Sequence, residues 1–205
     1  MTNYIKRYLN EVEIIAQTIN NQSIESVIQE VILVKKSRGR IFFLGIGGSA
    51  ANCSHAVNDF RKIAEIEAYT PMDNVAELTA RTNDEGWDTV FSEWLKRSNL
   101  NKSDLIFILS VGGGSKEKNI STNLISAIDY AKKIGAKIVG IVGRDGGYTA
   151  INSSNCIIIP KTSDNTITPH AESWQAVIWH LIVTDPRVQS FKNKWENIEE
   201  KKYEF

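Results

Sequence analysis

The sequence predicts an α/β protein in which helices cover both faces of a parallel sheet of five strands. Short apolar runs alternate with helical patterns between about residues 40 and 184, the order expected of a parallel sheet. These runs are almost continuously apolar, which is typical of strands buried on both sides. Glycine-rich turns follow the first and third runs, at the strand ends where such sheets bind their ligands.

The composition indicates one globular domain over residues 1–205. Hydrophobic residues make up 42% of the chain, and the formal net charge of +0 argues against a general nucleic-acid-binding surface. Because there is no apolar run of membrane-spanning length and no signal-peptide pattern, we expect a cytoplasmic protein without membrane partners. Cys53 and Cys156 fit small buried thiols of a reducing compartment.

Two helices are expected before the first strand, between about residues 4 and 37, because apolar residues recur there at helical spacing. A polar stretch at 20–23 separates them, and Ser23 is the predicted N-cap of the second helix. The charged tail from 185 to 205 predicts a solvated helix with a disordered end. In between, strands are expected at 40–44, 66–69, 104–109, 137–142 and 156–159, and helices at 49–64, 75–81, 88–97, 123–134 (ended by Gly135) and 169–183.

The first glycine turn predicts an anion site. The run 41–44 breaks at glycines, Ser49 follows, and a helical pattern begins. Free N–H groups and the dipole at such a helix N-terminus favour an anion such as phosphate. His55 and Asp59, four residues apart, fall on one face of the same helix. A phosphate site beside an ionisable pair suggests chemistry on a phosphorylated metabolite.

The second glycine turn, 110–115, offers close backbone approach and serine hydroxyls. Ser121 is predicted to cap the following helix, and Lys116 or Lys118 could reach a bound phosphate. A different polar stretch, at 83–86, is expected to be a loop in which Asn83 or Asp84 could bind sugar hydroxyls.

The last helix carries Glu172 and His180. Their spacing of eight residues separates them by about 12 Å along a straight helix, too far to hold one small ligand. Either the helix starts after Glu172 or the site is shared between subunits. A competing interpretation of the first turn is dinucleotide binding, since residues 45–50 fit G-x-G-x-x-A. That pattern alone is weak, and no acidic residue ends the second strand, so we expect no nucleotide cofactor.

The motifs, taken in order, resemble those of sedoheptulose 7-phosphate isomerases, which are phosphoheptose isomerases built on the sugar isomerase (SIS) domain. The resemblance covers roughly residues 4–184. Its components are the turn 45–49, His55 with Asp59, Asn83-Asp84 with Trp87 and Phe91, the stretch 143–147, and Glu172 with His180.

This resemblance implies a three-layer, flavodoxin-like fold and a homotetramer with sites at subunit interfaces. It implies isomerisation of a ketose phosphate to an aldose phosphate through an enediol, with Asp59 as the base and His180 as the acid. The product would supply heptose units for lipopolysaccharide or capsule. Zinc is a possible cofactor, held by His55, Asp59, Glu172 and His180. The expected substrate- and phosphate-binding residues are Gly47, Gly48, Ser49, Asn83, Asp84, Ser110, Gly112, Gly113, Gly114, Ser115, Ser121 and Glu172.

The chain also departs from the family pattern. Asp59 stands where glutamate is usual, Glu172 replaces glutamine, and Ile46 stands where asparagine is frequent. In the second turn, Gly112 and Gly114 replace hydroxyl or amide side chains, and about six extra residues precede the helix. An alternative function is therefore a non-catalytic SIS protein that binds a sugar phosphate or assembles with a protein partner.

Overall fold

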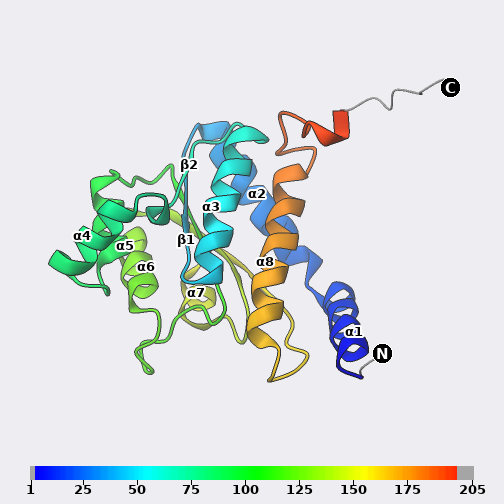
Figure 1. Cartoon of the computed structure of the whole chain (residues 1–205). Coiled ribbons are helices and arrows are strands. Elements are labelled where there is room, and N and C mark those ends of the chain that lie inside the picture. Colours follow the sequence, from blue (N-terminus) through cyan, green and yellow to red (C-terminus); the bar gives the residue numbers. More distant parts are fainter. Residues whose placement is uncertain (1–2, 198–205) are drawn as a thin grey trace.

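One parallel sheet organises the computed structural model, which describes residues 3–197 (Figure 1). Its strand order is β2-β1-β3-β4-β5, which matches the predicted flavodoxin-like arrangement. Strand order reverses between β1 and β3, so the two glycine turns that follow these strands flank the switch point. The strands are β1 (Ile41–Leu44), β2 (Ala68–Tyr69), β3 (Leu105–Ser110), β4 (Lys137–Val142) and β5 (Asn155–Ile158).

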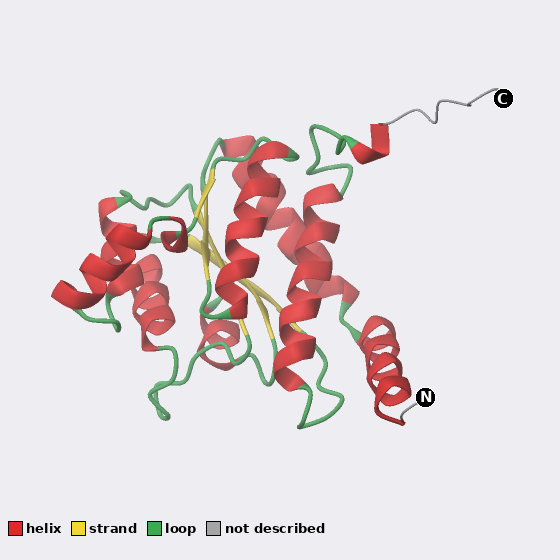
Figure 2. Ribbon diagram, viewed as in Figure 1, coloured by secondary structure: helices red, strands yellow, loops and turns green. Residues whose placement is uncertain are grey.

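Helices cover both faces of the sheet, so the three-layer prediction is confirmed (Figure 2). Alternate strand residues face opposite ways: Phe43 and Phe107 pack under α2, α3 and α8, whereas Phe42 and Ile106 pack under α5 and α6. This double burial explains the continuous apolar runs. The helices are α1 (Asn3–Thr18), α2 (Asn21–Ser37), α3 (Gly48–Lys62), α4 (Val75–Glu85), α5 (Val90–Arg97), α6 (Thr122–Ile134), α7 (Gly147–Asn152) and α8 (Ile167–Thr184), with 3₁₀ turns at Pro71–Asp73 and Trp195–Asn197.

The strands and helices predicted between residues 4 and 184 are present, with three local corrections. The N-cap of α2 is Asn20, whose side chain accepts from the N–H of Ser23, so Ser23 is not the cap. The short helix α7 was not expected, because it begins at glycines and has little apolar pattern. Helix α4 continues to Glu85, beyond the predicted end at 81. Gly135 ends α6 in the left-handed region, as expected.

The segment after α8 corrects the prediction of a solvated helix. Residues 185–194 form no helix and instead run as a strap across the ends of α2 and α3. The strap is anchored by Val188, which is fully buried, and by the N–H groups of Ser190 and Phe191, which donate to Ile63 O. Lys35 Nζ donates to the carbonyl of Val188. The predicted disordered end lies outside the described residues from 198 onward.

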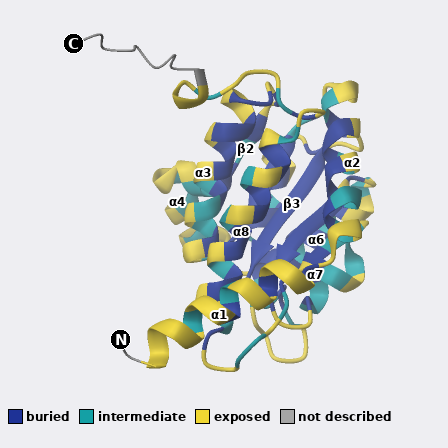
Figure 3. Ribbon diagram, turned by 90° about the vertical axis from the view of Figure 1, so that its right-hand side faces the viewer, coloured by how far each residue is buried: buried dark blue, intermediate teal, exposed yellow. Residues whose placement is uncertain are grey.

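Helix α1 projects from the body of the molecule and is largely exposed (Figure 3). Its main polar attachment is the buried Glu11, which accepts from Thr166 Oγ1 at 2.7 Å and lies 2.8 Å from His170 Nε2. Tyr8 stacks on the same imidazole, with ring centroids 4.5 Å apart. Several apolar side chains of α1 remain exposed, namely Tyr4, Ile5, Leu9 and Ile14.

Both cysteines are unpaired. Cys53 is buried as expected, and burial raises the pKa of its thiol well above the ordinary value. Cys156 is only partly buried, which corrects the prediction, although desolvation still raises its pKa to about 11. Among residues 3–197, no helix has the length and apolar character needed to cross a membrane.

Candidate active site

Helices α3 and α8 lie side by side and run in the same direction from the carboxyl edge of the sheet (Figure 1). Asn52 Nδ2 joins them by donating to the backbone oxygen of Glu172 at 2.9 Å and to Gln175 Oε1 at 3.1 Å. We call this contact the α3–α8 seam. It is formed by Gly48, Asn52, His55 and Asp59 on α3 and by Glu172, Gln175, Trp179 and His180 on α8.

The seam brings three of the predicted residues together. Asp59 Oδ2 lies 3.7 Å from His55 Nε2 and 3.7 Å from His180 Nε2. The other carboxylate oxygen, Oδ1, accepts from Asn58 Nδ2 at 2.7 Å, so Oδ2 is the oxygen that faces the imidazoles. Asp59 is 9% exposed, which leaves one edge of a largely buried carboxylate open to a ligand.

His180 is held with one ring nitrogen available. Its Nδ1 lies 2.7 Å from the carbonyl oxygen of Ala176, so this nitrogen carries the proton in the neutral ring and Nε2 keeps a free lone pair. The indole of Trp179 stacks on the ring at 3.5 Å between centroids and also touches His55. The side chain of His180 is 45% exposed, so its ring is accessible to a ligand.

The same three side chains fit a metal ion. Their ligand atoms lie within 4.8 Å of one another. Two imidazole nitrogens and a carboxylate oxygen are typical zinc ligands. The contact from His180 Nδ1 to Ala176 also orients Nε2 in the way that a second-shell carbonyl orients a ligating histidine.

Glu172 lies at the other end of the seam. Helix α8 begins at Ile167, so it does not start after Glu172, and about 12 Å of continuous helix separates Glu172 from His180. The Glu172 carboxylate lies against the backbone of Gly48, where a Cβ would come within 2.5 Å of Oε2. Within one chain, therefore, Glu172 does not join the three-residue cluster, and a role as its fourth ligand would need a second subunit.

The first glycine turn has the predicted strand–turn–helix geometry. Gly47 has φ +64 and precedes α3, which begins at Gly48. The hydroxyl of Ser49 is buried and has no hydrogen-bond partner among residues 3–197. The turn therefore presents a helix N-terminus and an unpartnered hydroxyl beside the carboxylate of Glu172.

The second glycine turn packs on α7. The carbonyl oxygens of Gly113 and Gly114 accept from the N–H groups of Thr149 and Tyr148, and Ser110 Oγ accepts from the N–H of Gly113. The N–H groups of Gly112 and Gly114 have no partner in the described part of the chain. These two donors are thus among the backbone groups of the turn that remain available to an anion.

The rest of this turn departs from expectation. Ser121 stands at the N-cap of α6 in the left-handed region, but its side chain makes no capping bond. Ser115 Oγ accepts from the N–H of Lys118, and Ser115 pairs with Ile120 to close a small hairpin. Lys116 is turned to Asp129 at 3.0 Å rather than toward the turn. The extra residues therefore form a self-contained projection.

Asn83 and Asp84 do not lie in a loop, because they form the last turn of α4. Asn83 Nδ2 donates to Asp84 Oδ1 at 2.8 Å. Helix α4 contacts α5 on the far side of the sheet from α8, so one chain does not bring these residues to the seam (Figure 1).

Two residues that shape the seam, Asn52 and Gln175, were not among the predicted site residues. Both lie one helical turn from predicted ones, His55 and Glu172, so helical spacing was the available signal. Gln175 is fully buried and its Nε2 has no partner among residues 3–197.

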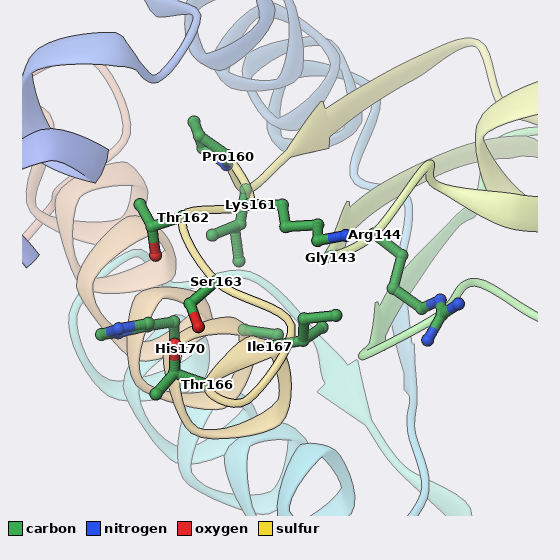
Figure 4. A pocket seen from close by; sticks show the side chains of 11 residues that line it. Gly143, Arg144, Pro160, Lys161, Thr162, Ser163, Thr166, Ile167 and His170 are labelled. Carbon is green, nitrogen blue, oxygen red and sulfur yellow. The ribbon is translucent and has the colours of Figure 1, made fainter. Parts of the chain in front are cut away.

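A small pocket lies at the carboxyl ends of β4 and β5 (Figure 4). Thr162, Ser163, Thr166 and His170 gather at one end, while the guanidinium of Arg144 points away from them. The cavity volume of about 10 Å³ has room for about one water molecule, so it cannot hold a sugar phosphate.

Comparison with known proteins identifies the class of protein to which this fold and seam belong. The protein-family model described as "SIS domain" matches residues 3–143, and the chain belongs to this family. Within it, the resemblance to phosphoheptose isomerases is confirmed. One from Sulfurimonas denitrificans is 33% identical over 194 residues, covering 89% of this chain and 93% of that protein.

Two further similarities were found. "Lincomycin biosynthesis protein LmbN" of Streptomyces lincolnensis is 31% identical over 154 residues, covering 70% of this chain but only 54% of that relative. The solved structure of phosphoheptose isomerase GmhA from Neisseria gonorrhoeae has a TM-score of 0.75 and 21% identity, covering 88% of this chain and 93% of that one. The structural match supports the fold.

Proposed function

We propose that this protein is a phosphosugar aldose–ketose isomerase that converts sedoheptulose 7-phosphate to D-glycero-D-manno-heptose 7-phosphate. The main support for this proposal is the position of the Asp59 carboxylate between the imidazoles of His55 and His180, each 3.7 Å away. These side chains lie on the α3–α8 seam, which starts at a glycine turn. Relatives named phosphoheptose isomerase, similar over most of their length, support this choice of reaction.

The proposed reaction passes through an enediol. Asp59 removes a proton from C1 of the ketose while His180, which enters the reaction with a proton on each ring nitrogen, delivers the Nε2 proton to the carbonyl oxygen at C2. His180 then takes the proton from the C1 hydroxyl, and Asp59 returns its proton to C2, so that C1 becomes the aldehyde and no net proton is consumed. The geometry that supports these roles is the open Oδ2 of Asp59 and the free Nε2 of His180.

The spacing along α3 supports a long substrate. Seven residues separate Gly48 from His55, which corresponds to about 10 Å of helix. A seven-carbon sugar phosphate carries its phosphate at the opposite end from the reacting C1 and C2. In this proposal the N–H groups of the two glycine turns bind the phosphate end, with Ser49, Ser110, Ser115 and Ser121 as nearby hydroxyls.

Zinc is proposed as a cofactor of the same cluster, held by His55, Asp59 and His180. Because the ion would occupy the same Asp59 and His180 atoms that transfer protons in the metal-free site, it would take over part of their role by polarising an oxygen of the substrate and stabilising the enediolate. Glu172 from a second subunit is the proposed fourth ligand. We propose a homotetramer, which the exposed apolar side chains Val177 and Leu181, next to His180 on α8, support.

A cytoplasmic location and a role in heptose supply for lipopolysaccharide or capsule belong to the same proposal. The two unpaired thiols, Cys53 and Cys156, fit a reducing compartment.

The test is to incubate the full-length protein with five-, six- and seven-carbon ketose phosphates and to follow aldose formation by NMR. Sedoheptulose 7-phosphate is expected to give the highest kcat/KM. Asp59→Asn should lower kcat at least about 100-fold, because it removes the base. Asp73→Asn, an exposed carboxylate outside the seam, is the control and should leave kcat unchanged. Binding of sugar phosphate without turnover would instead favour the non-catalytic alternative.

A further inference from the structure

We propose that Arg144 binds the phosphate group of the substrate and supplies the positive charge that the second glycine turn lacks. This inference rests on the proposed function, because it names a further residue for the same sugar phosphate. Arg144 lies in the turn after β4 with φ +54, in the left-handed region. A non-glycine residue is uncommon there, and such strain is concentrated in binding and catalytic turns.

The side chain of Arg144 lies against the second glycine turn. A Cβ built on Gly112 would lie 3.4 Å from Arg144 Cδ, so the aliphatic stem packs directly on the glycine backbone. The free N–H of Gly112 belongs to the same backbone, and that of Gly114 follows two residues later. Arg144 therefore adds a cation beside the two N–H groups that remain available in the turn.

Arg144 is also a basic side chain near this turn whose charge is not already neutralised by an ion pair. Within residues 3–197 its guanidinium has no hydrogen-bond or ion-pair partner. By contrast, Lys116 pairs with Asp129 at 3.0 Å. Lys161 pairs with Asp164 at 2.5 Å, and the hydrogen bond from Lys161, together with the charge of Arg144, lowers the pKa of Asp164.

The space beside Arg144 suits a small anion rather than a second protein. An open depression of about 270 Å³ is lined by Arg144, Asp145, Lys161 and Ile167. Ligand pockets start at about 300 Å³, so the volume fits one end of a sugar phosphate. The carboxylate of Asp145 is turned to the N–H of Gly147 at 3.2 Å. A planar guanidinium can grip a phosphate dianion through two parallel N–H bonds, which a lysine ammonium cannot do.

Arg144→Gln tests the assignment, with Lys133→Gln as the control, because it removes an exposed cation in the last turn of α6 that does not line the depression. The variants and the unmodified protein would be compared for KM and kcat with sedoheptulose 7-phosphate and for the Kd of inorganic phosphate by ³¹P NMR. Arg144→Gln is expected to raise KM and the phosphate Kd at least about tenfold, with kcat changed less than about threefold. Arg144→Lys should recover part of the loss, and Lys133→Gln should change neither constant by more than about twofold.

Equal effects of Arg144→Gln and Lys133→Gln would overturn the inference, because general surface charge would then explain them. Unchanged KM and Kd in a folded Arg144→Gln protein, checked by its melting temperature, would also overturn it. If the unmodified protein binds phosphate through Arg144 but turns over no sugar phosphate, the inference stands and the proposed reaction fails. If turnover is present and insensitive to Arg144, the reaction stands and the inference fails.

Discussion

Asn52 on α3 and Gln175 on α8 are joined by a hydrogen bond of 3.1 Å that fixes the register of the two helices. Asn52 sits one turn before His55, and Gln175 sits just over one turn before His180. The pair thus holds the two imidazoles at equal distances from Asp59. In this way a buried amide pair determines the geometry of the cluster without belonging to it.

Replacing Asn52 by leucine should lower the free energy of unfolding by about 1–3 kcal/mol, because Gln175 Oε1 would lose its partner while buried. Urea denaturation measures this loss. Ser26→Ala on α2 is the control, since it removes only an exposed hydrogen bond to the Gln22 carbonyl. Equal stability of the two variants would show that the Asn52 amide does not lock the register.

Zinc should raise the melting temperature of the protein, because an ion that binds only the folded chain stabilises it by mass action. His55→Ala, which removes one of the three clustered donors, should abolish most of that shift. Asp73→Asn, outside the cluster, should keep it. Calorimetry gives the melting temperature of each protein with and without zinc. A shift of equal size in the unmodified protein, His55→Ala and Asp73→Asn would exclude His55 as a ligand.

Glu11 should make stability depend on pH in the acid range. Hydrogen bonds from Thr166 and His170 lower the pKa of this carboxyl below its ordinary 4.5. A lowered pKa means that the stabilisation is fully present above pH 4.5 and is lost as the pH falls through the lowered value.

Urea denaturation at several pH values tests this. The unmodified protein should lose stability faster below about pH 4.5 than Glu11→Gln, so that the two curves converge. Glu13→Gln, an exposed neighbour on α1, should follow the unmodified protein. Parallel curves for Glu11→Gln and the unmodified protein would contradict the prediction.

Two adjacent glycines of the second turn should respond differently to alanine. Gly113 has φ +69, and a Cβ there would lie 1.9 Å from Gly146 O, so Gly113→Ala should cost at least about 2 kcal/mol of stability or prevent folding. Gly112→Ala meets only the flexible Arg144 side chain at 3.4 Å and should change stability by less than about 1 kcal/mol. Thermal unfolding of both variants decides; similar melting temperatures would refute the argument.

More of the fold than of the candidate site could be predicted from the sequence. Continuous apolar runs mark buried strands, and apolar residues at helical spacing mark helices, so each element can be predicted from its own residues. For this reason every strand was predicted within two residues of its observed bounds. The pairing of His55 with Asp59 is also local, because four residues form one helical turn. The placement of Glu172 against Gly48 depends on how two distant helices pack, which no local pattern contains.

Other differences have equally specific causes. Asn83 and Asp84 were expected in a loop because they are polar, but α4 is a helix without buried residues, so no apolar stripe marked its extent. The charged tail was predicted to be a solvated helix because of its composition. Instead, burial of the Val188 side chain and the backbone bonds to Ile63 attach residues 185–194 to α2 and α3 as the strap. Ser121 was expected to cap α6 through its side chain, but its backbone is in the left-handed region and the side chain makes no capping bond. A serine in the sequence does not indicate this backbone conformation.

The strap has a consequence for how the molecule is made. It supplies partners to the last turn of α3 from a point more than a hundred residues further along the chain, through Ser190 and Phe191 to Ile63. During synthesis, the helix that carries His55 and Asp59 therefore has its C-terminal end closed only after Ser190 and Phe191 have left the ribosome. A chain synthesised only as far as α8 would hold the sheet but not yet the finished end of that helix.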